Sequence, residues 1–192
     1  GRDVIAHLGD TEGFHSSLHL YMDDGVGLYL SVNSGGRAGA SNTLRSAVFQ
    51  DFSDRYFPTT LPPDGRVPEA EAKRHAEMMT GSWESTRRSE SNFFALFSLL
   101  GQVKVTLDDK GNLVVPALLG PNGRPREWVE IAPFVWRDKN GEDRLAAQLE
   151  NGRVVRWSMD FMSPFMVFDR VPAGKDGAWL IPAACVAAAV LL

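Results

Sequence analysis

The stretch that decides the fold at the start of the chain is His7-Leu8-Gly9-Asp10-Thr11-Glu12-Gly13-Phe14, which an alternation of apolar and polar residues continues to Asn33-Ser34. Such alternation predicts extended structure from His7 to Met22 and again from Val26 to Val32. Asp23-Asp24-Gly25 is a turn signal between the two runs. The sequence therefore predicts a β-hairpin.

A glycine-rich connection over residues 33–41 leads from this hairpin into an expected helix that ends near Tyr56. Ser41 or Asn42 is the expected N-cap, because a short polar side chain there accepts a hydrogen bond from the first turn. Apolar residues follow at spacings of three and four, which places them on one stripe that packs on a sheet. These residues are Leu44, Val48, Phe49 and Phe52.

The hairpin and helix resemble the third conserved element of β-lactamase-related serine hydrolases, the class C β-lactamase and penicillin-binding protein family. In that element Lys-Thr-Gly or His-x-Gly opens an edge strand beside the catalytic serine. The resemblance covers residues 1–57 and implies the C-terminal part of a β-lactamase-like α/β domain. It also implies esterase or peptidase chemistry through an acyl-enzyme, on a small-molecule or peptide substrate, with no cofactor.

The resemblance assigns roles to three residues. His7 takes the position of the family's lysine and is the expected catalytic residue of this strand. Gly9 leaves room for the acyl group, and the backbone N–H of Asp10 corresponds to a donor of the oxyanion hole, so both are expected to bind substrate. No serine is followed three residues later by lysine. The nucleophile motif S-x-x-K is therefore absent, and the chain is expected to be inactive alone.

The middle of the chain changes character. Residues 58–76 contain a proline-rich linker and the start of a short helix that runs from Glu69 to Met79. Short strands with turn signals such as Asn151-Gly152 follow over residues 77–172, and Gly81-Ser82-Trp83 resembles the opening of lipocalin-like barrels. The expected fold class is therefore α+β, with a β-rich lipocalin-like barrel after the hydrolase part. The expected strands are 82–88, 102–107, 112–116, 127–134, 144–149, 154–157 and 165–171, and the expected core includes Trp83, Trp128, Trp136 and Trp157.

Two segments are unusually apolar. Phe93 to Leu100 is expected to plug the barrel, or to face a membrane or the hydrolase domain. Residues 179–192 carry no charge and are interpreted as the start of a transmembrane helix, with a buried or disordered tail as the alternative. Together with the resemblance, this tail predicts a membrane-anchored protein whose remaining part is periplasmic or extracellular.

Charge and composition exclude several functions. Basic and acidic residues are interspersed and the net charge is −4, so no nucleic-acid partner is expected. The single cysteine, Cys185, provides neither an internal disulfide nor a cysteine-based metal site. His15 and His19 would lie about 13 Å apart on one strand, too far to share a metal ion, and are expected to be exposed or half-buried. His75 is expected to be solvated, and no metal site is predicted.

The alternative function is non-catalytic. In this interpretation the hairpin is only structural, and the chain is a β-barrel binding module with an apolar ligand, or a pseudoenzyme. The presence of S-x-x-K and Y-x-N in the parent gene would discriminate between the two functions. The oligomeric state does not follow from the sequence.

Overall fold

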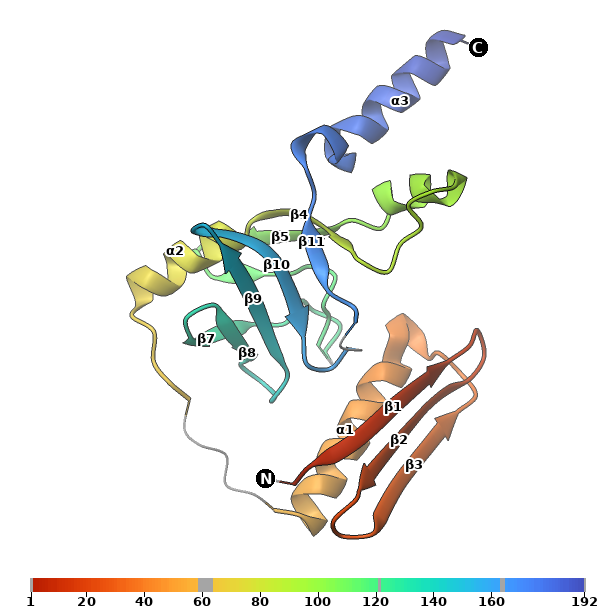
Figure 1. Cartoon of the computed structure of the whole chain (residues 1–192), viewed down its shortest axis with the longest axis vertical. Coiled ribbons are helices and arrows are strands. Elements are labelled where there is room, and N and C mark those ends of the chain that lie inside the picture. The colour runs from red at the N-terminus through yellow and green to blue at the C-terminus, as the bar shows by residue number, and fades with distance from the viewer. Residues whose placement is uncertain (1, 59–63, 121, 163–164, 192) are drawn as a thin grey trace. The chain divides into compact units, whose positions relative to one another are not determined.

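The computed structural model describes residues 2–58, 64–120, 122–162 and 165–191 and is mixed α+β (Figure 1). The chain divides into two compact units. Unit 1 is Gly1–Pro63 with Gly120–Gly123, and unit 2 is Asp64–Leu119 with Arg124–Leu192. Each unit is described by itself below.

Unit 1 contains an antiparallel three-stranded sheet with the order β1-β2-β3. Its strands are β1 Val4–Asp10, β2 His15–Tyr21 and β3 Val26–Val32. The expected hairpin is therefore a meander of three strands. The run from His7 to Met22 breaks because the Thr11 N–H donates to the Phe14 carbonyl, 2.9 Å away, and so closes a turn between β1 and β2.

A single long helix, α1 Ala40–Tyr56, packs against β2 and β3, after a short 3-10 helix, η1 Arg37–Gly39. The interface is partly polar: the Tyr21 hydroxyl lies 2.6 Å from the Ser53 hydroxyl, and the His19 ring stacks on Phe49 with centroids 4.1 Å apart. Arg45 is buried on the inner face of the helix, whereas Leu44 is 45% exposed. The side of α1 that faces the sheet is thus rotated away from Leu44.

Unit 2 is built on an eight-stranded antiparallel sheet that curls into a nearly closed barrel, with the order β6-β5-β4-β11-β10-β9-β8-β7 (Figure 1). Helix α2 Glu69–Met79 packs against β5, β6 and β10. The strands are β4 Gly81–Ser85, β5 Val103–Leu107, β6 Leu113–Val114, β7 Trp128–Ala132, β8 Val135–Asp138, β9 Arg144–Glu150, β10 Arg153–Met159 and β11 Phe168–Arg170.

Of two hairpin turns in this sheet, the turn at Asn151-Gly152 is predictable from the sequence, and the turn between β7 and β8 is not. Asn151 and Gly152 both have positive φ, 52° and 73°, which is the two-residue turn that an Asn-Gly pair predicts. The β7–β8 turn was not expected, because its left-handed residue is Phe134, with φ of 60°. The Glu130 carboxylate holds this turn by accepting a hydrogen bond from the Phe134 N–H at 2.6 Å. The strand expected over residues 127–134 is therefore shorter, β7 Trp128–Ala132, and a second strand, β8 Val135–Asp138, follows it.

The inside of the sheet is filled with side chains. Trp83, Trp136 and Trp157 are at most 2% exposed, and Trp128 is 5% exposed, which confirms the expected tryptophan core. Helix α2 closes the core with Ala76 and Met79. The apolar segment, expected to plug the barrel or to face a membrane or the hydrolase domain, forms a 3-10 helix, η2 Phe93–Leu99. Its Phe93 and Leu96 side chains are about two-thirds exposed, at 68% and 66%, so they do not plug the barrel.

The C-terminal segment contains η3 Ala173–Lys175 and α3 Gly177–Leu191, which includes Pro182. Among the described residues, no helix combines the length and apolar character needed to cross a bilayer. Helix α3 has 15 residues, whereas a span takes about 20. This finding corrects the expected transmembrane helix over 179–192 and, with it, the membrane-anchored localisation.

Candidate functional site

The β1 strand places the three expected site residues, His7, Gly9 and Asp10, on two different faces of the sheet. His7 pairs with Leu18 and Gly9 with Ser16, whereas Asp10 pairs with His15. Because side chains alternate across a strand, His7 lies on the same face of the sheet as Gly9, and the Asp10 side chain lies on the opposite face. The α1 face is the one that carries Asp10, since the Asp10 carboxylate contacts Arg45 of α1.

Asp10 is the centre of a small ionic cluster at this end of the sheet. Its Oδ1 lies 2.7 Å from His15 Nδ1 and 3.0 Å from Arg45 Nη1. Partial burial works to raise the pKa of Asp10, but the hydrogen bonds from His15 and Arg45 outweigh it, so the pKa is lowered below its ordinary value. An ionised carboxylate only accepts hydrogen bonds, so His15 Nδ1 is the donor of this bond.

Arg45 ties the cluster to the sheet and was missed in the sequence. Its Nη1 donates to the Ser16 carbonyl at 2.8 Å, and its side chain is 5% exposed. Its position in the sequence could have indicated its burial. Arg45 lies four positions after Ser41 and four before Phe49, so the three residues share one face of the helix. A buried arginine on that face indicates a buried carboxylate or carbonyl partner.

Gly9 lies in close contact with its neighbour in the sheet. A Cβ at position 9 would lie 2.6 Å from the Ser16 hydroxyl oxygen, closer than side-chain atoms pack. This contact by itself favours glycine at position 9, without any ligand.

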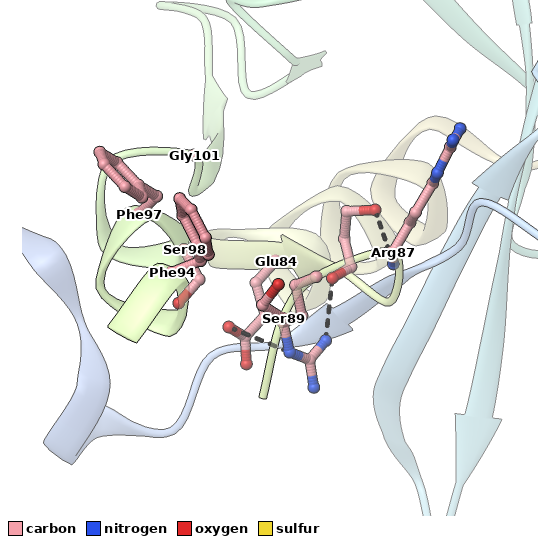
Figure 2. A pocket seen from close by; sticks show the side chains of 9 residues that line it. Glu84, Arg87, Ser89, Phe94, Phe97, Ser98 and Gly101 are labelled. Atoms are coloured by element: carbon pink, nitrogen blue, oxygen red, sulfur yellow. Dashed lines mark hydrogen bonds and ion pairs between the residues drawn. The ribbon is translucent and has the colours of Figure 1, made fainter. Parts of the chain in front are cut away.

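Unit 2 carries a pocket of about 370 Å³ between β4 and η2 (Figure 2). That volume lies at the lower end of the range of small-molecule sites. Phe94 and Phe97 form its apolar wall and are 52% and 57% exposed. The full lining is Glu84, Ser85, Arg87, Arg88, Ser89, Phe94, Phe97, Ser98 and Gly101.

Hydrogen bonds fix the η2 side of the pocket. The Asn92 side chain caps η2 by accepting from the Phe94 N–H at 3.0 Å, and the Ser98 hydroxyl donates to the Ala95 carbonyl at 2.6 Å. Just after η2, the Gln102 side chain accepts from the Gly177 N–H at 2.9 Å. The phenylalanines are thus presented by an ordered segment.

The polar side of the pocket is organised by the Arg88 guanidinium. Its Nε lies 3.6 Å from Glu84, its Nη1 donates to the Ser85 carbonyl at 2.9 Å, and its Nη2 lies 3.0 Å from Glu90. Its Nη1 also lies 4.0 Å from the Asp169 carboxylate of β11. The two glutamates differ sharply, because the Glu84 side chain is 10% exposed and the Glu90 side chain is 71% exposed. Arg88 is therefore held firmly by Glu84 and Ser85 and only loosely by Glu90.

The histidines hold no metal site. Within the described part of the chain, no group of three or more histidine, cysteine or acidic residues is placed to bind an ion. His19 is buried rather than half-buried, and His75 is 5% exposed rather than solvated. His75 Nδ1 lies 2.7 Å from Oε1 of Glu130, whose side chain is fully buried, so this pair connects α2 to the β7–β8 hairpin.

Comparison with known proteins gives little similarity. No family model and no curated protein matches the chain. Two solved structures, described as SurE with D-Leu and as SurE, are both 15% identical, with TM-scores of 0.43 and 0.41. They cover 88% and 86% of this chain, which spans only 35% and 34% of their length. Likenesses with TM-scores below 0.5 carry no argument about this chain.

These findings correct the family expected from the sequence. No family model and no curated protein supports the motif. The prediction of a membrane-anchored β-lactamase-related serine hydrolase is therefore withdrawn. It rested on His-x-Gly and a following hairpin and helix, a local pattern that alternation and helical spacing alone produce.

Proposed function

We propose that this chain is a non-catalytic binding module, and that the β4–η2 pocket of its lipocalin-like β-rich unit binds a small amphipathic molecule. One observation carries the proposal: Phe94 and Phe97 are more than half exposed beside an ordered arginine and glutamate. Large apolar side chains that water surrounds at an ordered concave site indicate a ligand-binding surface. The ligand would cover the two rings and use the polar groups for orientation.

The ligand of this proposal lies outside the barrel. The interior positions are occupied by tryptophan and aliphatic side chains, with Trp83, Val115 and Leu145 fully buried. Emptying such an interior would cost several kcal/mol for each large side chain that lost its packing. A ligand at the surface pocket needs no such rearrangement.

Amide chemical shifts of the whole chain test this function. The probes are octyl glucoside and octanoate, each below its aggregation concentration. Binding is expected to shift the amides of Ser89, Ser98 and Gly101 and to saturate. Phe97→Ser, which removes part of the apolar wall, is expected to weaken binding about tenfold, in line with the burial of one large apolar side chain.

Leu96→Ser is the matched control, because Leu96 is 66% exposed in the same helix but does not line the pocket. It is expected to leave the affinity unchanged. If neither probe shifts these amides, or if both serine variants act alike, the pocket is not a binding site.

A second candidate concerns His7, Gly9 and Asp10. We propose that β1 binds an extended peptide or acyl segment along its edge, with His7 and Gly9 beside the segment and the Asp10 N–H as a donor. In unit 1, β1 pairs only with β2, and Val4 to Gly9 carry no fixed charge, whereas proteins usually protect such an edge with lysine or proline.

An acetylated and amidated hexapeptide that alternates valine and threonine tests this second candidate. It is expected to shift the amides of Ala6 and Leu8, and Leu8→Lys is expected to reduce its affinity by placing a charge on the edge. Tyr29→Lys on β3 is the control and is expected to have no effect at β1. Equal effects of the two lysines would reject the candidate.

A further inference from the structure

The charges around the β4–η2 pocket select among amphipathic ligands, an inference that rests on the function proposed above. Two arginines and one glutamate line the pocket, which gives its lining a formal charge of +1. The glutamate, Glu84, is buried and already lies 3.6 Å from Arg88 Nε. The lining therefore has no carboxylate left for a cationic ligand.

The Arg88 guanidinium offers one replaceable position. Its Nε faces Glu84 and its Nη1 donates to the Ser85 carbonyl, both parts of β4, and Nη1 also lies 4.0 Å from the Asp169 carboxylate of β11. Its Nη2 faces Glu90, which does not line the pocket and whose side chain is 71% exposed. Exposed ion pairs stabilise a protein by about 0–1 kcal/mol, so little free energy opposes the departure of Glu90.

The Glu90 carboxylate also shows what the position accepts. It lies 3.0 Å from Nη2 and forms an ion pair with the guanidinium. A carboxylate from another molecule would make the same ion pair. Glu90 is thus an intramolecular occupant that competes with a ligand for Arg88.

Phe94 and Phe97 lie on the η2 side of the pocket (Figure 2), and Arg88, which pairs with Glu84, lines the same pocket. Arg87 makes a poorer anchor, because its side chain is directed away from the two phenylalanines and lies 5.7 Å from the centroid of the Phe165 ring (Figure 2). We infer that the pocket selects an anionic amphiphile, whose carboxylate replaces that of Glu90 on Arg88 Nη2 while its apolar chain covers Phe94 and Phe97.

Affinities of matched probes for the whole chain test this inference. Octanoate is expected to bind more tightly than octyl glucoside and octyltrimethylammonium, which share its apolar chain but not its charge. Glu90→Gln removes the competing carboxylate and is expected to tighten octanoate binding about two- to fivefold, the equivalent of one exposed ion pair. The affinity for octyl glucoside is expected to stay the same.

Two arginine variants locate the anchor. Arg88→Lys keeps a positive charge beside buried Glu84 but loses the fixed fork of donors, and it is expected to weaken octanoate binding at least about threefold. Arg87→Gln removes a whole charge from the lining and is expected to have the smaller effect. Circular dichroism checks that each variant is folded.

The outcomes separate this inference from the proposed function. If octanoate and octyl glucoside bind equally well and Glu90→Gln changes neither affinity, the pocket binds amphiphiles without choosing anions, and the inference is wrong while the proposed function stands. If Arg87→Gln weakens octanoate binding more than Arg88→Lys does, the anchor is misassigned. If no probe binds, the proposed function itself fails.

Discussion

Arg170 is the residue that connects the most elements of unit 2. Its guanidinium carbon lies 4.3 Å from the centroid of the Trp83 ring, and it donates to the carbonyls of Val154, Thr80 and Met78 at 3.0, 2.9 and 2.6 Å. Two of these carbonyls lie at the C-terminal end of α2, where a positive charge also favours the helix dipole. One side chain of β11 thus holds α2 and β10 around Trp83.

We therefore expect Arg170→Met to lower the free energy of unfolding by about 1–3 kcal/mol, since three carbonyls lose a charged donor and Trp83 loses its stacked guanidinium. Urea titration followed by tryptophan fluorescence measures the change. Arg156→Met is the control, because Arg156 contacts only the partly exposed Asp169 in an exposed ion pair and is expected to cost under about 1 kcal/mol. Equal losses would show that the Arg170 contacts add nothing specific.

Gly9 gives a second prediction for single residues. Gly9→Ala places a Cβ at 2.6 Å from the Ser16 hydroxyl oxygen and is expected to destabilise the sheet of unit 1 by about 1–3 kcal/mol. Ser16→Gly in the same chain removes that oxygen and is expected to restore most of the loss. Hydrogen exchange of the β1 and β2 amides measures both. If the amides of the Gly9→Ala variant exchange as slowly as those of the wild type, the added Cβ does not destabilise the sheet.

At the scale of elements, the contact between α1 and its sheet contains a titratable group. His19 is buried against Phe49, and its Nδ1 has no partner among the described residues. Burial lowers the pKa of His19 below its ordinary 6.5. The folded state therefore takes up this proton less readily than the unfolded state, so stability is complete above pH 6.5 and falls as the pH drops below it.

Hydrogen exchange of α1 and β2 is therefore expected to be faster at pH 5 than at pH 7.5, after correction for intrinsic rates. His19→Phe keeps the stacked ring without the charge and is expected to remove much of this dependence. His7→Phe, an exposed residue of the same sheet, is expected to retain it. The lowered pKa of Asp10 acts in the same direction but only as the pH falls below its ordinary 3.8.

The elements were predictable where local chemistry determines them. The C-terminal end of α1 and the bounds of α2 follow from helix formers and spacing, and the 151–152 turn follows from Asn-Gly. The expected N-cap of α1, Ser41 or Asn42, was wrong, because the helix begins at Ala40 after Gly39 and no side chain caps it. The β7–β8 turn was missed because Phe134 adopts its left-handed conformation with the help of Glu130 rather than of a glycine. At the candidate sites, alternation places His7 and Gly9 on one face, but the contact of Asp10 with Arg45 depends on how α1 packs.

At the scale of the whole molecule, the two units differ in the size of their buried apolar cores. Every residue of the largest buried apolar cluster lies between Ala76 and Phe168, inside unit 2. Apart from Tyr21, the residues buried most deeply in unit 1 are polar, among them Ser17, His19 and Arg45. Apolar burial is the main source of folding free energy, so the units are expected to differ in autonomy.

A chain of residues 64–192 is expected to unfold cooperatively in urea and to keep the near-ultraviolet circular dichroism of its packed tryptophans. A chain of residues 1–58 is expected to show neither slow hydrogen exchange nor a cooperative transition. A cooperative transition of the shorter chain, with none for the longer one, would reverse this assignment of stability.

The pairing of β4 with β11 also has a consequence for the order of folding. Residues 83 and 170 are partners, although the rest of the sheet lies between them in sequence. Contacts between such distant positions slow folding, because a long loop must close before they form. During synthesis β4 leaves the ribosome well before its partner β11. Until β11 follows, one edge of β4 is unpaired, and another nascent chain can pair with it incorrectly.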